Sequence, residues 1–433
     1  MLKINKLRFI IFSFIILFIS QEGFSQPGLS SPYTFYGVGY LSRTNNVRNM
    51  SMGGIGIGTR NAISLNVKNV ASLTAIDSNS FLFEAAAVGY YEQLQTENVN
   101  EDMVSGSLSH IVLGFPIMHW WKTSIGLLPY SNVDYTVLSF EDKQDIGKVQ
   151  YEYGGTGGLN QFYWSNGFKP IKNISIGINA SYIFGTTDKY QKVTFPDSSY
   201  YIGTRSVNSI NISDLSIELG VQYHTEIKKN LNLVVGAVFK PKIDMAAKQS
   251  NLSRTFLGEL NQIIYYKDTI AYTADEEGSV VLPASYGFGF SLENVNKWMV
   301  GVDYKHEAWD EYSSFGENDT LLKSSNLIAI GGEYIPNINS TSYFNRIDYR
   351  FGAKFNQSSL KLRNQQLNNL GITFGLGLPI KSIALRRSKA MINLGFEIGT
   401  RGTLENNLIK ENYVNFHFGL LINEFWFMKR KYN

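Results

Sequence analysis

The chain has 433 residues, with 39 Lys and Arg against 36 Asp and Glu, five His, no Cys, and an aromatic set of 6 Trp, 26 Tyr and 28 Phe. The absence of cysteine excludes disulfides, thiolate metal sites and a lipidated amino-terminal cysteine, so any membrane attachment is non-covalent. A net charge of +3 gives no electrostatic support for binding nucleic acid.

The first 25 residues have the pattern of a secretory signal peptide. A basic start from Lys3 to Arg8 is followed by the almost wholly apolar stretch Phe9 to Ile19, and small and polar residues lead to a cleavage site near Ser25. We therefore expect residues 1–25 to be removed on export. No later stretch approaches the roughly 18 apolar residues that a membrane-spanning helix needs.

Residues 26–79 are rich in Gly, Ser and Asn, contain short apolar patches such as residues 50–57, and lack the pattern of a strand. A barrel of about 14 strands is wider than its own side chains can fill. We expect this segment to fold into the lumen as a hatch. A periplasmic extension is the alternative.

From residue 80 onward the dominant signal is alternation of apolar and polar residues, which places successive side chains on opposite faces of a strand. In residues 173–185, for example, Ile174, Ile176 and Ile178 share one face. The pattern predicts strands near 80–93, 104–115, 119–137, 158–168, 173–185, 211–225, 231–240, 283–294, 297–308, 324–335, 345–356, 370–379, 390–399 and 411–421.

Many of these strands have about 10 residues or more, the length of tilted strands that cross a bilayer. A soluble all-β protein also alternates, but its strands are usually about 5 to 6 residues long. We predict an all-β fold, a transmembrane antiparallel β-barrel of about 14 strands over residues 80–427 in the outer membrane of a Gram-negative bacterium, followed by a basic periplasmic tail at 428–433. Short connections alternate with long ones, as periplasmic turns and external loops do; the longest is 241–282.

The predicted lumen face carries charges of both signs. Such charges can pair with one another and with the hatch, whereas a lining of one sign would indicate an ion-selective pore. Hatch anchoring is our first interpretation of this polar network and substrate contact the second. Its members are Asp214, Glu218, Asp303, Lys305, Glu333, Arg346, Asp348, Arg350, Lys354 and Glu397.

Several stretches resemble one family of transporters. Ser51 to Arg60 and Ser64 to Ala71, followed by a strand from Phe81, resemble the hatch region of FadL-type outer-membrane transporters, and the closest likeness is to versions of that barrel in Bacteroidetes-type bacteria. The resemblance implies a barrel of about 14 strands, a small hatch inside it, and passage of hydrophobic compounds through a side opening into the membrane. Its hatch residues here are Met52, Gly53, Gly54, Asn69, Val70 and Ala71.

One departure from the family concerns the hatch. The family commonly has Asn-Pro-Ala where this chain has Asn69, Val70 and Ala71. Without proline the backbone loses a fixed φ and gains a donor, which affects the expected gating geometry.

A second proline bears on the side opening. Pro129 lies within the third predicted strand, where it cannot donate to a ladder and so indicates a bulge or kink. In the family, the third strand is kinked beside the hatch and leaves a lateral gap. Alternatively, Pro129 ends a strand before an external loop.

Catalytic signals are lacking in the sequence. The glycine runs do not match a phosphate-binding fingerprint. The five histidines are scattered without metal-ligand or triad spacing; they are His110, His119, His224, His306 and His417. We expect no enzyme activity, no cofactor and no metal.

Two hypotheses for function follow. The first is passive uptake of hydrophobic small molecules, such as fatty-acid-like compounds, with hatch-controlled lateral exit into the membrane. The second is a structural or accessory barrel subunit of a larger outer-membrane protein complex, motivated by the missing hatch proline and the long segment 241–282. The expected partners are outer-membrane lipid, a hydrophobic small molecule and, under the second hypothesis, other outer-membrane proteins, but no nucleic acid.

Overall fold

The computed structural model describes residues 30–42, 45–198, 200–260, 263–381 and 389–425. The predicted signal peptide and basic tail lie outside these residues. The helices of the described part of the chain are short, and none combines the length and hydropathy of a transmembrane helix.

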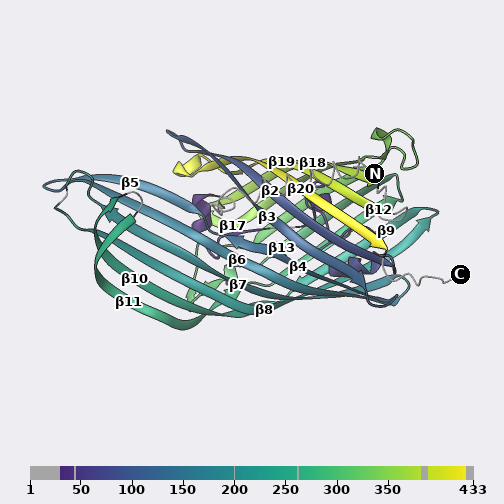
Figure 1. Ribbon diagram of the computed structural model, residues 1–433, viewed down its shortest axis with the longest axis horizontal. Coiled ribbons are helices and arrows are strands. Elements are labelled where there is room, and N and C mark those ends of the chain that lie inside the picture. The colour runs from purple at the N-terminus through teal and green to yellow at the C-terminus, as the bar shows by residue number, and fades with distance from the viewer. Residues whose placement is uncertain (1–29, 43–44, 199, 261–262, 382–388, 426–433) are drawn as a thin grey trace, which may run out of the picture.

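Fourteen antiparallel strands close into a barrel, which confirms the predicted fold class (Figure 1). Each strand pairs with the next around the wall, and the last pairs with the first. In order around the barrel the strands are β2 (Ser80–Gln95), β3 (Asn100–Pro116), β4 (Trp121–Asn132), β6 (Gly147–Ile171), β7 (Ile174–Thr194), β8 (Gly203–Lys228), β9 (Leu231–Lys240), β12 (Ser285–Asn294), β13 (Trp298–Glu307), β16 (Ser325–Tyr334), β17 (Asp348–Leu362), β18 (Gln365–Lys381), β19 (Lys389–Gly402) and β20 (Lys410–Phe425).

The two faces of the wall differ as the alternation predicts. On β8 the outward residues Leu215 and Ile217 are 62% and 50% exposed, whereas the intervening Ser216 and the later Gln222 are buried in the lumen. Exposed apolar side chains recur on the outward face of the other strands. A continuous apolar outer surface is stable only against hydrocarbon, so this is a membrane-spanning barrel of the outer-membrane type.

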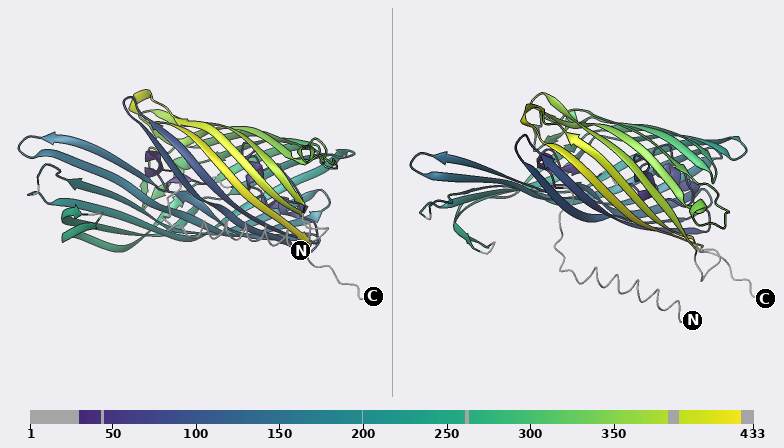
Figure 2. Two further views of the ribbon diagram at one scale, coloured as in Figure 1. Left: turned by 45° about the horizontal axis from the view of Figure 1, so that its top comes forward. Right: turned by 90° about the horizontal axis from the view of Figure 1, so that it is seen from above.

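Six strands form a sheet extension beyond the barrel: three barrel strands continue into it and three further strands join them. β6, β7 and β8 have 25, 21 and 26 residues, about twice the 9–11 or so that cross a bilayer, or more. Their far halves pair with β5 (Tyr135–Lys143) and β10 (Ile243–Leu260), and β10 pairs with β11 (Ile263–Leu282). The extension has the order β5-β6-β7-β8-β10-β11 and projects to the left in both panels of Figure 2.

The extension corrects one expectation. Residues 138–157, 186–210 and 241–282 were expected to be external loops, but they are largely strands. Apolar residues that lie next to the barrel, such as Met245, Ala247 and Val280, are buried in a hydrophobic cluster. Farther out, most residues of both faces are exposed or half-buried, so the apolar alternation is too short to be recognised. Short elements complete the same end of the molecule, namely η3 (Trp309–Glu311), β14 (Ser313–Ser314), β15 (Glu317–Asn318) and η5 (Glu405–Asn407).

The amino-terminal segment fills the lumen as a hatch, seen as the purple trace inside the barrel in Figure 1. Its first part contains η1 (Pro32–Phe35) and β1 (Tyr40–Leu41), and Val38 joins a hydrophobic cluster of the half nearer the extension. Its second part contains α2 (Val47–Met50) and η2 (Val70–Ala75), and packs in the half that carries the short turns.

Candidate functional site

The hatch is held against the wall by close approach of backbones. A Cβ on Gly236 of β9 would collide with the carbonyl oxygen of Ile57, and one on Gly331 of β16 would collide with that of Met52. Glycine is therefore required at these inward positions because the hatch backbone occupies the space of a side chain. The alternation of apolar and polar residues does not indicate this contact.

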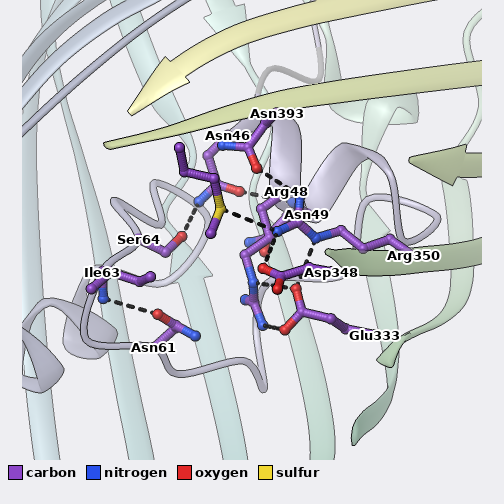
Figure 3. A network of polar contacts seen from close by, with 11 residues as sticks. Asn46, Arg48, Asn49, Asn61, Ile63, Ser64, Glu333, Asp348, Arg350 and Asn393 are labelled. Atoms are coloured by element: carbon purple, nitrogen blue, oxygen red, sulfur yellow. Dashed lines mark hydrogen bonds and ion pairs between the residues drawn. The ribbon is translucent and has the colours of Figure 1, made fainter. Parts of the chain in front are cut away.

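A buried charge cluster anchors α2 (Figure 3). Arg48 of the hatch makes a bidentate ion pair with Glu333 of β16, with Nε and Nη2 each 2.9 Å from a carboxylate oxygen. Arg350 of β17 donates to the same carboxylate at 2.8 Å, to Asp348 at 3.0 Å and to Asn393 at 2.7 Å. Two cations and two anions balance, which is the condition under which buried charge is tolerated.

A second anchor holds the loop that follows α2. The Asp303 carboxylate on β13 accepts backbone N–H bonds from Gly56 at 2.6 Å, Ile57 at 2.8 Å and Gly58 at 3.4 Å. Consecutive amides that converge on one carboxylate form a small anion-binding nest. The predicted hatch residues Met52, Gly53 and Gly54 belong to this region.

Met52, Gly53 and Gly54 each make a separate contact that holds them in place. Met52 is fully buried and packs with Ile55, Met299 and Ala329. The Gly53 N–H donates to Thr373 Oγ1 at 2.7 Å, and the Gly54 carbonyl accepts from Lys68.

The hatch stretch Asn69 to Ala71, which lacks the proline of FadL-type hatches, is held in place by Asn69. Asn69 donates to the carbonyl oxygens of Ile57 at 2.9 Å and Val221 at 3.2 Å, and its Oδ1 accepts from the Ala71 N–H, which caps η2. Val70 and Ala71 are buried behind it. Arg60, another cation of the hatch, donates to a neutral partner, Thr74 Oγ1, at 2.8 Å. Burial lowers the pKa of its guanidinium to about 10.

The wall ladder is incomplete beside Pro129. β3 and β4 pair from Pro116 opposite Lys122 to Ile111 opposite Leu127, and no further. Beyond this point β4 pairs instead with β1 of the hatch, and its ladder with β6 has a register shift between Pro129 and Ser131. The strand edges therefore separate at the proline.

A cavity of about 850 Å³ lies on the lumen side of this separation. Leu108 and Leu127 line it from the two strand edges, together with Pro129 and the hatch residues Met50 and Lys68. Residues 30–42 lie across the separation, where Ser31 N–H donates to the Asp134 carbonyl and Ser42 N–H to that of Tyr130, each at 2.9 Å. A pocket of about 20 Å³, lined by Arg48 and Arg350, lies on the other side of the hatch.

Sequence and structure comparisons place this geometry in a family. A family model described as BamG matches residues 4–433. The chain belongs to the BamG family. No curated protein is similar enough to count as a relative.

Three solved structures share the barrel with its plug, which bears out the FadL-type resemblance at the level of the fold. A Pseudomonas aeruginosa FadL homologue has 11% identity and a TM-score of 0.59, covering 90% of this chain and 100% of its own. The P. putida toluene transporter TodX has 13% identity and a TM-score of 0.58, with 91% and 99% covered. The Ralstonia pickettii toluene transporter TbuX has 11% identity and a TM-score of 0.55, with 88% and 98% covered.

The remaining residues predicted for the lumen network fall into separate groups. Lys354 pairs with Glu397 at 2.6 Å, and Lys305 pairs with Glu307 at 2.8 Å. Asp214 accepts from the Ala246 N–H at 2.9 Å, where β10 begins. Glu218 lines a second cavity of about 170 Å³, together with Lys305.

Arg346 is not part of the network. It ends η4 (Phe344–Arg346), a short helical turn outside the strands, and its guanidinium lies 5.4 Å from the ring centre of Tyr343. The strand predicted from residue 345 begins too early here, because β17 (Asp348–Leu362) starts only at Asp348.

The sequence analysis did not predict the hatch residues that pair with the charged residues of the wall. Arg48 carried a usable signal, since it is one of few charges in a segment expected to be buried. Ser31, which donates to Glu411 of β20, carried none. Glu411 also pairs with Arg401 of β19 at 2.8 Å, so the start of the hatch is attached to the wall at β19 and β20.

Proposed function

We propose that this BamG-family barrel is an accessory subunit of a larger outer-membrane protein assembly, and that its sheet extension is the docking surface. The observation that carries the proposal is that the two edge strands of the extension, β5 and β11, are largely unpaired on their outer side within the described residues. Within the described residues, β5 pairs with β6 alone, and β11 pairs with β10 and, over two residues, with β14.

The unpaired edges are long and exposed on both faces. Residues 136–143 of β5 and 265–278 of β11 are exposed without a break. Large apolar side chains occur along them, namely Val137, Leu138 and Phe140 on β5 and Ile270 and Tyr272 on β11. A protein that works alone usually blunts such edges, because their free N–H and C=O groups are templates for another strand. An extended segment or sheet edge of another exported protein fits this surface by strand addition.

The hatch supports the same proposal. The Arg48, Glu333 and Arg350 cluster and the Asp303 nest would have to be broken for the hatch to move, and each break would leave buried groups unpaired. A hatch fixed in this way fits a barrel that serves as a scaffold better than one that works by moving a gate.

The test is purification of the full-length protein from its native host in a mild detergent. In one variant a short turn replaces residues 251–273, which removes the tip of β10 and β11. We expect the wild type to elute with stoichiometric protein partners and the variant to lose them while the barrel keeps its heat-modifiable mobility. A matched control replaces the β2–β3 turn, residues 96–99, with Asn-Gly. A wild-type barrel that elutes alone, or a trimmed variant that keeps its partners, would contradict the proposal.

A second function, passive uptake of hydrophobic molecules with lateral exit between β3 and β4, is favoured by the end of their ladder beside the cavity of about 850 Å³. Its test is uptake of labelled fatty-acid-like and monoaromatic compounds in a deletion strain complemented with either variant. The uptake hypothesis expects slower uptake in the deletion strain, and it expects the variant trimmed at 251–273 to restore the wild-type rate. Unchanged rates across the panel in the deletion strain would count against uptake.

A further inference from the structure

Arg60 is a cation of the hatch that lies at the end of the barrel with the short turns, which is the periplasmic end of outer-membrane barrels. Its guanidinium donates to Thr74 Oγ1 at 2.8 Å, to Ser175 Oγ at 3.3 Å and to Gln222 Oε1 at 3.4 Å. Ser175 closely follows the β6–β7 turn, and Gln222 lies near the end of β8. All three acceptors are neutral, and no carboxylate of the described residues is paired with Arg60.

Two wall residues bring further basic groups to the same place. A Cβ on Gly167 of β6 would meet a backbone carbonyl oxygen of the hatch at 2.9 Å, so Gly167 faces the lumen, and Lys169, two residues further on, shares its face. Gln222 contacts the hatch, so His224, two residues further along β8, also faces the lumen. The His224 N–H donates to the Asn173 carbonyl at 2.9 Å, which holds this end of β8 against the β6–β7 turn.

These groups form a cluster of like charge that is open to the periplasm. Arg60 and Lys172 lie close enough to Lys169 to repel its ammonium group, and Arg60 and Lys169 repel the charged form of His224. We call these four residues the basic cluster. Lys172 is exposed and the other three are half-buried, so a ligand from the periplasm can reach the cluster at the surface.

The turns around the basic cluster extend its positive field. Residues 169–173, 226–230 and 294–297 form or flank the neighbouring β6–β7, β8–β9 and β12–β13 turns, and they contain one carboxylate, Glu226, which accepts from the Asn230 N–H at 2.8 Å. Their lysines, here called the turn lysines, are Lys169, Lys172, Lys228, Lys229 and Lys297. Ile171 and Ile227, at the ends of β6 and β8, are 59% and 52% exposed. Positive charge therefore spans three turns, with exposed apolar side chains among them.

We propose that the basic cluster and the turn lysines bind an acidic segment of a periplasmic partner, in which several Asp or Glu side chains follow one another. The proposal rests on the accessory function proposed above and adds a second docking surface, at the opposite end of the barrel from the sheet extension. Carboxylates would neutralise like charges that repel one another, and a positive patch recognises a negative one. A lipid headgroup fits less well because Lys169 and His224 face the lumen. A single phosphate fits less well because the positive charge spans three turns.

The test is binding of a fluorescent octaglutamate peptide to the purified full-length barrel in a non-ionic detergent, with octaglutamine as the uncharged match. The test variants are Lys169→Gln/Lys172→Gln and Arg60→Gln; the first changes only side chains at the β6–β7 turn and leaves the hatch intact. The control Lys248→Gln/Lys267→Gln removes the same charge from exposed lysines of β10 and β11, in the sheet extension. Heat-modifiable mobility establishes that each variant has folded. Inorganic phosphate, added at constant ionic strength, serves as the competitor for a small-anion site.

We expect octaglutamate to bind the wild type and the control alike, and to bind each test variant roughly tenfold more weakly. Binding should weaken as salt is added, because salt screens exposed charges. Equal affinity for the wild type and Lys169→Gln/Lys172→Gln, or equal binding of octaglutamine, would overturn the proposal, and displacement by millimolar phosphate would assign a small-anion site instead. A wild type that elutes alone from its host contradicts the accessory function, whereas failure to bind octaglutamate overturns this proposal alone and leaves the extension edges as the docking surface.

Discussion

The substitution Arg48→Met tests whether the charge cluster holds the hatch. Arg48 is 7% exposed, and both of its bonds to Glu333 are charge-assisted. Its loss leaves two buried carboxylates, of Glu333 and Asp348, against the single cation of Arg350. Removing one partner of a buried ion pair costs about 3–5 kcal/mol, whereas an exposed pair is worth about 0–1 kcal/mol. The exposed pair of Glu141 with Lys143, 3.4 Å apart, supplies the control Glu141→Gln.

Amide hydrogen exchange in the purified barrel reports this cost locally. A loss of about 3–5 kcal/mol in the stability of the hatch corresponds to exchange faster by roughly two to three and a half orders of magnitude for amides of residues 50–58. Strands on the opposite wall should keep their protection, and Glu141→Gln should change nothing in the hatch. The double variant Arg48→Met/Glu333→Met restores balance between Arg350 and Asp348, so it should exchange more slowly than the single variant. Unchanged exchange in Arg48→Met would refute the anchoring argument.

Three further substitutions probe the other contacts of the hatch. Asp303→Asn keeps the shape of the side chain but removes its charge from three backbone amides, so the loop at 56–58 should lose about 1.5–3 kcal/mol and become sensitive to proteases in limited digestion. Gly236→Ala should displace the hatch at Ile57 and lower the free energy of unfolding in urea by about 1–3 kcal/mol, while Gly89→Ala, whose Cβ would meet its nearest atom at 4.0 Å, should be close to neutral; equal effects would be evidence against close approach. Val70→Pro introduces the Asn-Pro-Ala of FadL-type hatches at the first position of η2, where proline is compatible, and should leave thermal unfolding unchanged or raise stability by up to about 1 kcal/mol; a large loss would show that the Val70 side chain itself is required.

The sequence by itself determined the type of wall and the side on which each wall residue lies. Because the side-chain period of a strand is two, the apolar set of β8 had to face lipid and Ser216 and Gln222 the lumen. The same reasoning placed Asp303, Glu333 and Arg350 inside. The composition of residues 26–79 predicted a hatch because a barrel of this size leaves room that its own side chains do not fill.

Only the tertiary structure decided which groups meet. Arg48 and Glu333 are 285 residues apart in the chain, and no local pattern encodes a contact that depends on how the hatch is seated in the barrel. The extension was missed for a related reason, since its strands have buried apolar residues mainly next to the barrel and so offer only a short apolar period to detect. The seating of the hatch likewise sets Arg60 beside Ser175 and Gln222, 115 and 162 residues away in the chain, so a basic cluster built from hatch and wall has no local pattern either.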